Sequence, residues 1–100
     1  MLYHKFNAIP TILDGIRFAS KKEGARYEAL KHLQSAGDVL FFLRQTPFHL
    51  PGNIKYINDF TVFWKDSTIS FEDVKGIKTP QYILKRKLVE HHYPITITEI

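Results

Sequence analysis

A chain of 100 residues has room for one domain with a thin hydrophobic core, so residues 1–100 are expected to form a single domain. The lack of cysteine in the sequence excludes a disulfide framework and a thiolate metal site, and it fits a reducing compartment. The net charge of +4 favours an anionic partner such as nucleic acid, although many basic proteins bind none. No stretch of the sequence is long and apolar enough for a membrane span, and Met1 to Lys5 do not lead into the apolar run of a signal peptide. A cytoplasmic location without a membrane partner is therefore expected.

The first third of the chain has the pattern of a short hairpin followed by a helix. Asp14-Gly15 is a turn signal between two short apolar runs, which predicts a hairpin. Ser20 has the chemistry of an N-cap, and Glu23 three residues later completes a capping box. These signals predict a helix from Lys21 to Ala36, with Gly37 as its C-cap.

Three strands are predicted next. Val39 to Leu43 is an apolar run of strand length, and Pro47 is expected to end that strand. Ile54 to Trp64 is rich in β-branched and aromatic residues, as a strand should be. Lys65 to Ser67 is the predicted turn to a third strand, Thr68 to Lys75. A period of two in the second strand places Tyr56, Asn58, Phe60 and Val62 on one face, and Ile57, Asp59, Thr61 and Phe63 on the other.

A second helix and a last strand complete the pattern. Thr79 and Pro80 have the residue types of an N-cap and a first helical position, and Tyr93-Pro94 ends the helix. Ile95 to Ile100 alternates apolar and polar residues, which predicts a final strand. The order helix, three strands, helix, strand (α-β-β-β-α-β) predicts an α/β fold with a mixed central β-sheet flanked by helices.

Two aspartates in the predicted second hairpin point to chemistry. Asp59 lies inside an apolar strand, where a carboxylate is unfavourable. Asp59 and Asp73 are equidistant from residue 66, so a hairpin that turns there brings them opposite each other. Two adjacent carboxylates repel unless a cation lies between them, and Mg²⁺ accepts carboxylate, backbone carbonyl and water oxygens. Lys75 shares a strand face with Asp73 and can position or polarise a water molecule, which is typical of a hydrolytic phosphodiesterase site.

The sequence also resembles a known group of enzymes. Asp59 followed by Asp73-Val74-Lys75 resembles the D…(D/E)xK signature of the PD-(D/E)xK nuclease superfamily. A wider set of residues, from about residue 10 to residue 100, resembles a small phage and prophage family of unknown function that is assigned to these nucleases by its motifs. That set is Phe18-Ala19-Ser20-Lys21-Lys22-Glu23, Tyr27, Leu30, Gly37, Gln45, Tyr56, Asp59-Phe60, Glu72-Asp73-Val74-Lys75-Gly76, Thr79 and Tyr82.

The resemblance implies a restriction-endonuclease-like core that hydrolyses DNA with Mg²⁺ or Mn²⁺. Asp59 and Asp73 match the two central metal ligands of the superfamily, and Lys75 matches its catalytic lysine. The carbonyl of Val74 matches the usual backbone ligand. Glu23 matches the helix glutamate that completes the metal shell.

Three details of this match leave alternatives open. Glu28 is the second choice for the helix glutamate. Asn58 stands where the superfamily often has the proline of its motif, a departure that is common among its members. A β-bulge would bring Glu72 inward as the ligand in place of Asp73.

DNA is the partner that the resemblance implies, and the small size favours recognition of branched DNA over a long base sequence. Holliday junction resolvases, which are similar in size and motif order, act as homodimers, and the apolar residues Phe41, Phe42 and Phe48 are the expected interface. A phage role would place the protein in the host-cell cytoplasm. The candidate DNA contacts are Lys21, Lys22, Arg26, Gln45, Lys78, Tyr82, Lys85 and Arg86.

Each of these residues also has a simpler explanation. Glu23 can serve only as the capping-box carboxylate, and basic residues on a helix often form no more than its solvated face. Asp73 and Lys75 can form a weak surface ion pair. Two non-catalytic functions are the alternatives to a nuclease: a nucleic-acid-binding module, and an accessory subunit of a phage DNA-processing complex.

Overall fold

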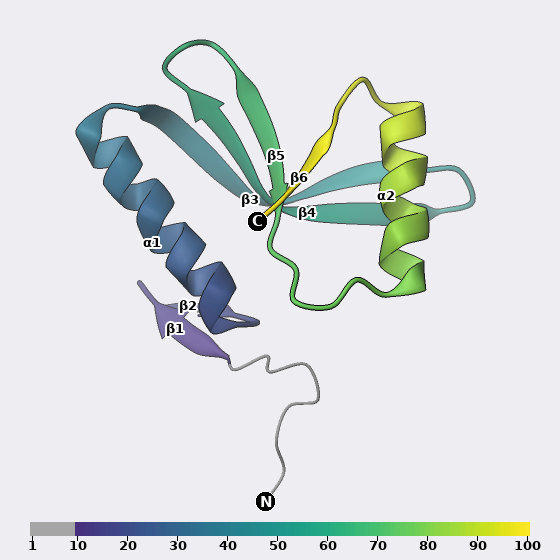
Figure 1. Cartoon of the computed structure of the whole chain (residues 1–100), viewed down its shortest axis with the longest axis horizontal. Coiled ribbons are helices and arrows are strands. Elements are labelled where there is room, and N and C mark those ends of the chain that lie inside the picture. The colour runs from purple at the N-terminus through teal and green to yellow at the C-terminus, as the bar shows by residue number, and fades with distance from the viewer. Residues whose placement is uncertain (1–9) are drawn as a thin grey trace, which may run out of the picture.

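The computed structural model describes residues 10–100, so the start of the chain considered above, Met1 to Lys5, lies outside the described residues. A four-stranded sheet with two helices and a separate two-stranded hairpin make up the fold (Figure 1). Its elements are β1 (Thr11–Leu13), β2 (Ile16–Phe18), α1 (Lys21–Ala36), β3 (Val39–Leu50), β4 (Ile54–Trp64), β5 (Ile69–Asp73), α2 (Pro80–His92) and β6 (Ile97–Glu99).

The main sheet is mixed, as predicted. Its strand order is β3-β4-β5-β6, in which the first two neighbouring pairs are antiparallel and β5 pairs with β6 in parallel. Parallel neighbours need a crossover connection, and α2 provides it between β5 and β6. The structure thus confirms a mixed α/β fold with two helices. Among residues 10–100, no helix has the length and apolar character required to cross a membrane.

The predicted boundaries of α1 and of the first hairpin are confirmed. The Ser20 side chain accepts a hydrogen bond from the Glu23 backbone N–H, and Gly37 ends the helix in the left-handed conformation with φ of 88°. Asp14 and Gly15 both have positive φ, as a two-residue hairpin turn requires. This hairpin packs closely on α1, because a Cβ placed on Gly24 would lie only 2.6 Å from a methyl group of Thr11.

Strand β3 is longer than the sequence predicts. It continues through Pro47 to Leu50, with Pro47 opposite Ile57 of β4. Pro47 was expected to end the strand, but β3 is an edge strand, where a residue without an N–H can be accommodated. Gln45, in the middle of β3, has a positive φ of 56°. Its neighbours in the strand pair with Phe60 and Asn58, which places Gln45 opposite Asp59.

The predicted alternation along β4 is wrong at its centre. Asn58 and Phe60 were expected to share one face, with Thr61 on the other. Instead the Asn58 amide hydrogen-bonds to the Thr61 hydroxyl, which also lies 2.9 Å from the Thr46 hydroxyl. Side chains three residues apart cannot meet in a regular strand, so the face of β4 changes near Asp59, opposite the irregular residue Gln45.

This change of face divides the sheet between the two helices. One core cluster contains residues of α1, and the other contains residues of α2. Figure 1 shows the two helices well apart, with α1 at the left and α2 at the right. The tip of the β3–β4 hairpin lies beside α2, and the chain returns from there toward α1 (Figure 1). The buried members of the first cluster are Phe18, Tyr27, Leu30, Val39, Phe60 and Val62, and those of the second are Leu50, Tyr56, Tyr82, Val89 and Ile97.

Two of the three phenylalanines expected at a dimer interface belong to these cores. Phe42 packs against the α1 cluster and Phe48 against the α2 cluster, where it lies edge-on to Phe71 with ring centroids 5.8 Å apart. Both are partly buried and have partners within the chain, so less of their surface is left for a second copy. Phe41 remains 45% exposed and stacks on Phe63.

Candidate metal centre

Asp59 and Asp73 meet across the β4–β5 hairpin, as predicted. Phe60 pairs with Glu72 in this hairpin, which sets Asp59 opposite Asp73. The Asp59 backbone N–H donates to Asp73 Oδ1 at 3.0 Å, and the Val74 N–H donates to Asp59 Oδ2 at 2.8 Å. Each carboxylate is thus held by a backbone N–H, and the two side chains lie together at the end of β5.

These carboxylates are poorly solvated. Asp73 is 1% exposed, and its Oδ2 is buried without a hydrogen-bond partner in the described structure. Burial raises the pKa of Asp59 and of Asp73 above the usual range, although the backbone N–H that each accepts and the charge of Lys75 act in the opposite direction. A buried carboxylate oxygen without a partner is costly for a protein unless a cation or a proton occupies the site.

Glu23 of α1 approaches the same site from the helix. It is 7% exposed, and burial raises the pKa of its carboxyl group, with a further upward contribution from the charge of Asp59. The charges of Arg44 and Lys75 lower it. Ser20 caps the helix through the backbone N–H of Glu23, so the Glu23 carboxylate can still lie near Asp59. Glu23 therefore belongs to the electrostatic environment of the site.

Lys75 lies beyond the end of β5, because the strand ends at Asp73 and not at Lys75 as predicted. Its ammonium group lies 4.5 Å from the centre of the Tyr82 ring on α2, and its charge lowers the pKa of Glu23, Asp59 and Asp73. The lysine thus neighbours all three carboxylates without being on a regular strand, because the chain leaves the sheet at Val74.

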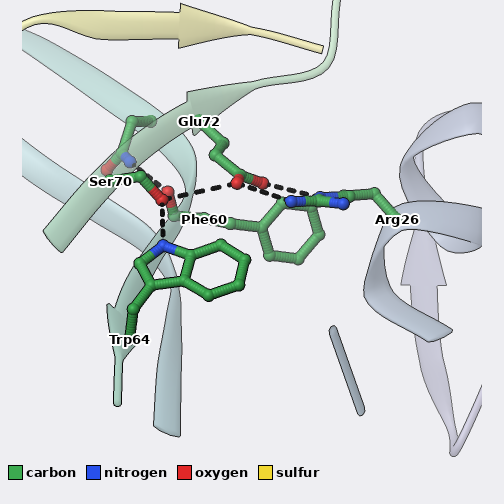
Figure 2. Close-up of polar contacts among 6 residues, drawn as sticks. Arg26, Phe60, Trp64, Ser70 and Glu72 are labelled. Carbon is green, nitrogen blue, oxygen red and sulfur yellow. Dashed lines mark hydrogen bonds and ion pairs between the residues drawn. The ribbon is translucent and has the colours of Figure 1, made fainter. Parts of the chain in front are cut away.

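Glu72, the alternative ligand, has a different partner. It is 2% exposed, and both of its carboxylate oxygens accept hydrogen bonds from Arg26 of α1, at 2.7 and 2.8 Å. Figure 2 shows Arg26 reaching from α1 to Glu72, with Ser70 and the indole of Trp64 completing the network. Glu72 therefore serves a buried ion pair, and the Arg26 guanidinium that was expected to contact DNA is already occupied.

The other candidate DNA contacts divide into two groups. Tyr82, Arg86 and Lys78 all contact the carboxylate of Glu99 on β6, so they stabilise the position of α2. Burial, and after it the hydrogen bond to Glu99, raises the pKa of Tyr82. The other residues have different surroundings: Lys22 donates to the Lys75 carbonyl at 3.2 Å, Lys21 and Gln45 are exposed, and Lys85 lines a pocket beside Lys75.

Arg44 is a residue of the site that the sequence analysis did not identify. Its guanidinium lies 4.7 Å from the centre of the Phe18 ring, and its charge lowers the pKa of Glu23 and Asp59. Its buried Nε has no hydrogen-bond partner in the described part of the chain. The only signal in the sequence was a charged residue at the end of an apolar run, which alone does not indicate a site.

The candidate ligand set among the described residues is smaller than the sequence predicts. Within residues 10–100, no group of three or more His, Cys, Asp or Glu side chains is arranged to hold a metal ion, so Glu23 does not complete a three-carboxylate set here. Mg²⁺ in proteins often has only one or two carboxylate ligands and retains several waters. The unpartnered Oδ2 of Asp73 beside Asp59 provides the oxygen chemistry for such an ion.

Taken together, the fold and the site define a small mixed α/β protein with a buried aspartate, Asp73, opposite a partly buried one, Asp59, and a lysine just beyond the end of a central strand. The chain belongs to the DUF1064 family, described as a protein of unknown function, whose sequence model matches residues 3–99. A comparison with curated proteins finds no match.

Proposed function

We propose that this protein is a metal-dependent endodeoxyribonuclease of the PD-(D/E)xK class that hydrolyses phosphodiester bonds in DNA. The observation that carries the proposal is the pairing of the partly buried Asp59 with the buried Asp73, since a backbone N–H holds each carboxylate in place while Asp73 Oδ2 has no partner among the described residues. A structural role alone does not explain why two carboxylates occupy a place where burial disfavours their charge.

The residues of the site have separate roles in this proposal. Asp59 and Asp73, with the carbonyl of Val74, would hold Mg²⁺ or Mn²⁺, and Glu23 would act from α1 through the waters around the site. The ion, when bound, would lower the pKa of a water nucleophile and neutralise charge on the phosphate. Lys75 would hold the attacking water in position, since its ammonium group neighbours the carboxylates and is not in an ion pair among the described residues.

The arrangement of secondary structure supports a restriction-endonuclease-like core. A helix that carries the glutamate precedes an antiparallel hairpin that carries the two aspartates and the lysine, and a helix then crosses over to a parallel strand. This order of motifs is the one in which the sequence resembles the PD-(D/E)xK nucleases. Branched DNA remains the favoured substrate, because a domain of this size has little surface for reading a long base sequence.

A homodimer is part of the same proposal, because cutting both strands of a junction needs two active sites. Since Phe42 and Phe48 are partly buried within the chain, the favoured interface candidate is the sheet face that carries Phe41. Phe41 and Leu43 of β3 and Ile69 of β5 are each between 45% and 48% exposed there.

Cleavage of labelled four-way junction, flap and linear duplex DNA tests the proposal. We expect cutting with Mg²⁺ or Mn²⁺ and none with EDTA, and we expect Asp73→Ala to abolish it, while Asp66→Asn, a change at an exposed residue in the turn between β4 and β5, leaves it intact. A preference for the junction would indicate a resolvase. If the wild type and Asp73→Ala bind the junction equally and neither cuts any DNA, the protein is a nucleic-acid-binding module.

A further inference from the structure

A basic pocket lies next to the candidate metal centre, between the tip of the β3–β4 hairpin and the first turn of α2. It has a volume of about 300 Å³. Lys55 comes from the hairpin, Lys85 from α2 and Lys75 from the segment between them, and no acidic residue of the described chain lines the pocket. None of these lysines forms an ion pair within residues 10–100. Three lysines around one hollow, none of them in an ion pair among the described residues, favour an anionic ligand.

Tyr56 provides an independent sign of a ligand in this pocket. It lines the pocket and is only 4% exposed, and its buried hydroxyl has no hydrogen-bond partner in the described structure. Its ring lies 6.4 Å from that of Tyr82, a second lining residue. Buried hydroxyl groups are nearly always hydrogen-bonded in folded proteins, so an unpartnered one beside a pocket indicates a missing acceptor.

The N-terminus of α2 adds further donors to the pocket. Thr79 is the N-cap and accepts from the Tyr82 N–H, and Pro80 has no N–H. The N–H of Gln81, in the first turn, has no acceptor within the helix. Thr79 and Gln81 both line the pocket, so the positive end of the helix dipole faces the same hollow.

We infer that this pocket binds a phosphate group of the DNA strand, adjacent to the phosphodiester that is cut. Its charged lining residues are all lysines, and the Tyr56 hydroxyl and the Gln81 N–H can both donate, which suits a phosphate. Lys75 belongs both to the pocket and to the surroundings of Asp59 and Asp73, so a strand can continue from one site into the other. The position relative to the cut rests on the proposed nuclease function, but the phosphate site itself does not.

Binding of a short fluorescent DNA duplex in EDTA, measured by fluorescence anisotropy, tests this inference without any cleavage. Lys55→Ala and Lys85→Ala are each expected to weaken binding severalfold and to reduce the dependence of log affinity on log salt by about one. The matched control is Lys65→Ala, since Lys65 lies at the tip of the other hairpin in an exposed pair with Asp38. If Lys55→Ala and Lys85→Ala bind the DNA duplex as tightly as the control Lys65→Ala, the inference is overturned. A failure of the wild type to bind the duplex would also overturn it.

Tyr56→Phe separates binding from folding. Because the hydroxyl has no partner in the chain, its removal should leave the melting temperature unchanged or slightly raised. Binding should weaken by up to about tenfold, the effect of one hydrogen bond to a charged group. Unchanged DNA affinity in this variant would show that the hydroxyl has no phosphate partner and would contradict the inference.

Competition by inorganic phosphate distinguishes a DNA site from a small-anion site. A comparison of DNA affinity with DNA cleavage in the pocket variants distinguishes the phosphate pocket from the nuclease proposal. Inorganic phosphate should compete with DNA only weakly, whereas binding of phosphate without binding of DNA would mark a small-anion site and overturn the assignment to DNA. If the pocket variants lose affinity and no DNA is ever cut, the pocket stands and the nuclease proposal fails. If DNA is cut with equal rate and affinity by all pocket variants, the nuclease proposal stands and the pocket inference fails.

Discussion

Asp73→Asn is expected to abolish metal-dependent cleavage while making the metal-free protein more stable. The amide keeps an oxygen that can accept the Asp59 N–H, but it removes a charge that burial disfavours. We expect a gain on the order of 1 kcal/mol in the free energy of unfolding, which corresponds to about 4–8 °C in the melting temperature of a domain of this size. Cleavage should fall by more than about 100-fold, since even outer-shell partners of a metal contribute about 10- to 100-fold.

The pH dependence of this difference follows from the direction of the pKa shift. The folded-state pKa of Asp73 is raised, so the folded protein binds more protons than the unfolded chain in the pH range between the two pKa values. The destabilisation by the charged group is therefore present at neutral pH and disappears as pH falls through the folded pKa. The difference in melting temperature between Asp73→Asn and the wild type should shrink in the same direction.

Thermal denaturation at several pH values, with and without Mg²⁺, measures both effects. Asp66→Asn is the matched control, because Asp66 is exposed and bonds to Thr68 lower its pKa, so its neutralisation should not stabilise the protein. Mg²⁺ should raise the melting temperature of the wild type and not that of Asp73→Asn. A variant that is less stable than the wild type at neutral pH would show that the Asp73 charge serves the fold.

Arg26→Met is expected to lower the free energy of unfolding by about 3 kcal/mol. The change leaves the carboxylate of Glu72, which is 2% exposed, without the guanidinium that binds both of its oxygens (Figure 2). The Ser70 hydroxyl, 3.4 Å away, is a poor substitute. Removing one partner of a buried ion pair costs more than removing both, because it leaves a charge without compensation.

Urea denaturation followed by the fluorescence of Trp64 measures this loss, since its indole donates to Ser70 in the same network. The double variant Arg26→Met/Glu72→Leu should recover much of the stability that the single variant loses. A loss below about 1 kcal/mol in the single variant, within the range of an exposed ion pair, would contradict a buried pair. Glu72→Gln should retain cation binding, whereas loss of binding would mean that Glu72 is a ligand.

Features of the fold that depend on local chemistry were predictable from the sequence. Ser20 and Gly37 set the ends of α1 because capping requires only a side-chain oxygen at one end and a left-handed residue at the other. The meeting of Asp59 and Asp73 followed from the turn centred at residue 66, which fixes the register of the hairpin. The prediction of this pair therefore needed no knowledge of the tertiary structure.

Features that depend on distant parts of the chain were not predictable. Pro47 indicates a strand end unless the strand is known to lie at a sheet edge, and the order of strands is not a local property. The change of face near Asp59 occurs opposite Gln45, whose positive φ no residue type dictates. Glu72 and Arg26 are 46 residues apart in sequence, so nothing near either one indicated their pairing.

Manganese binding measured by electron paramagnetic resonance tests the central claim most directly, namely that Asp59 and Asp73 form a divalent-cation site. The signal of free Mn²⁺ should decrease on addition of the wild type, and Mg²⁺ should restore it by competition. Asp59→Asn and Asp73→Asn should each leave the Mn²⁺ free, whereas Asp66→Asn, in the exposed turn between β4 and β5, should bind it like the wild type. Equal binding of Mn²⁺ by the wild type and both aspartate variants, or no binding by any of them, would contradict the claim.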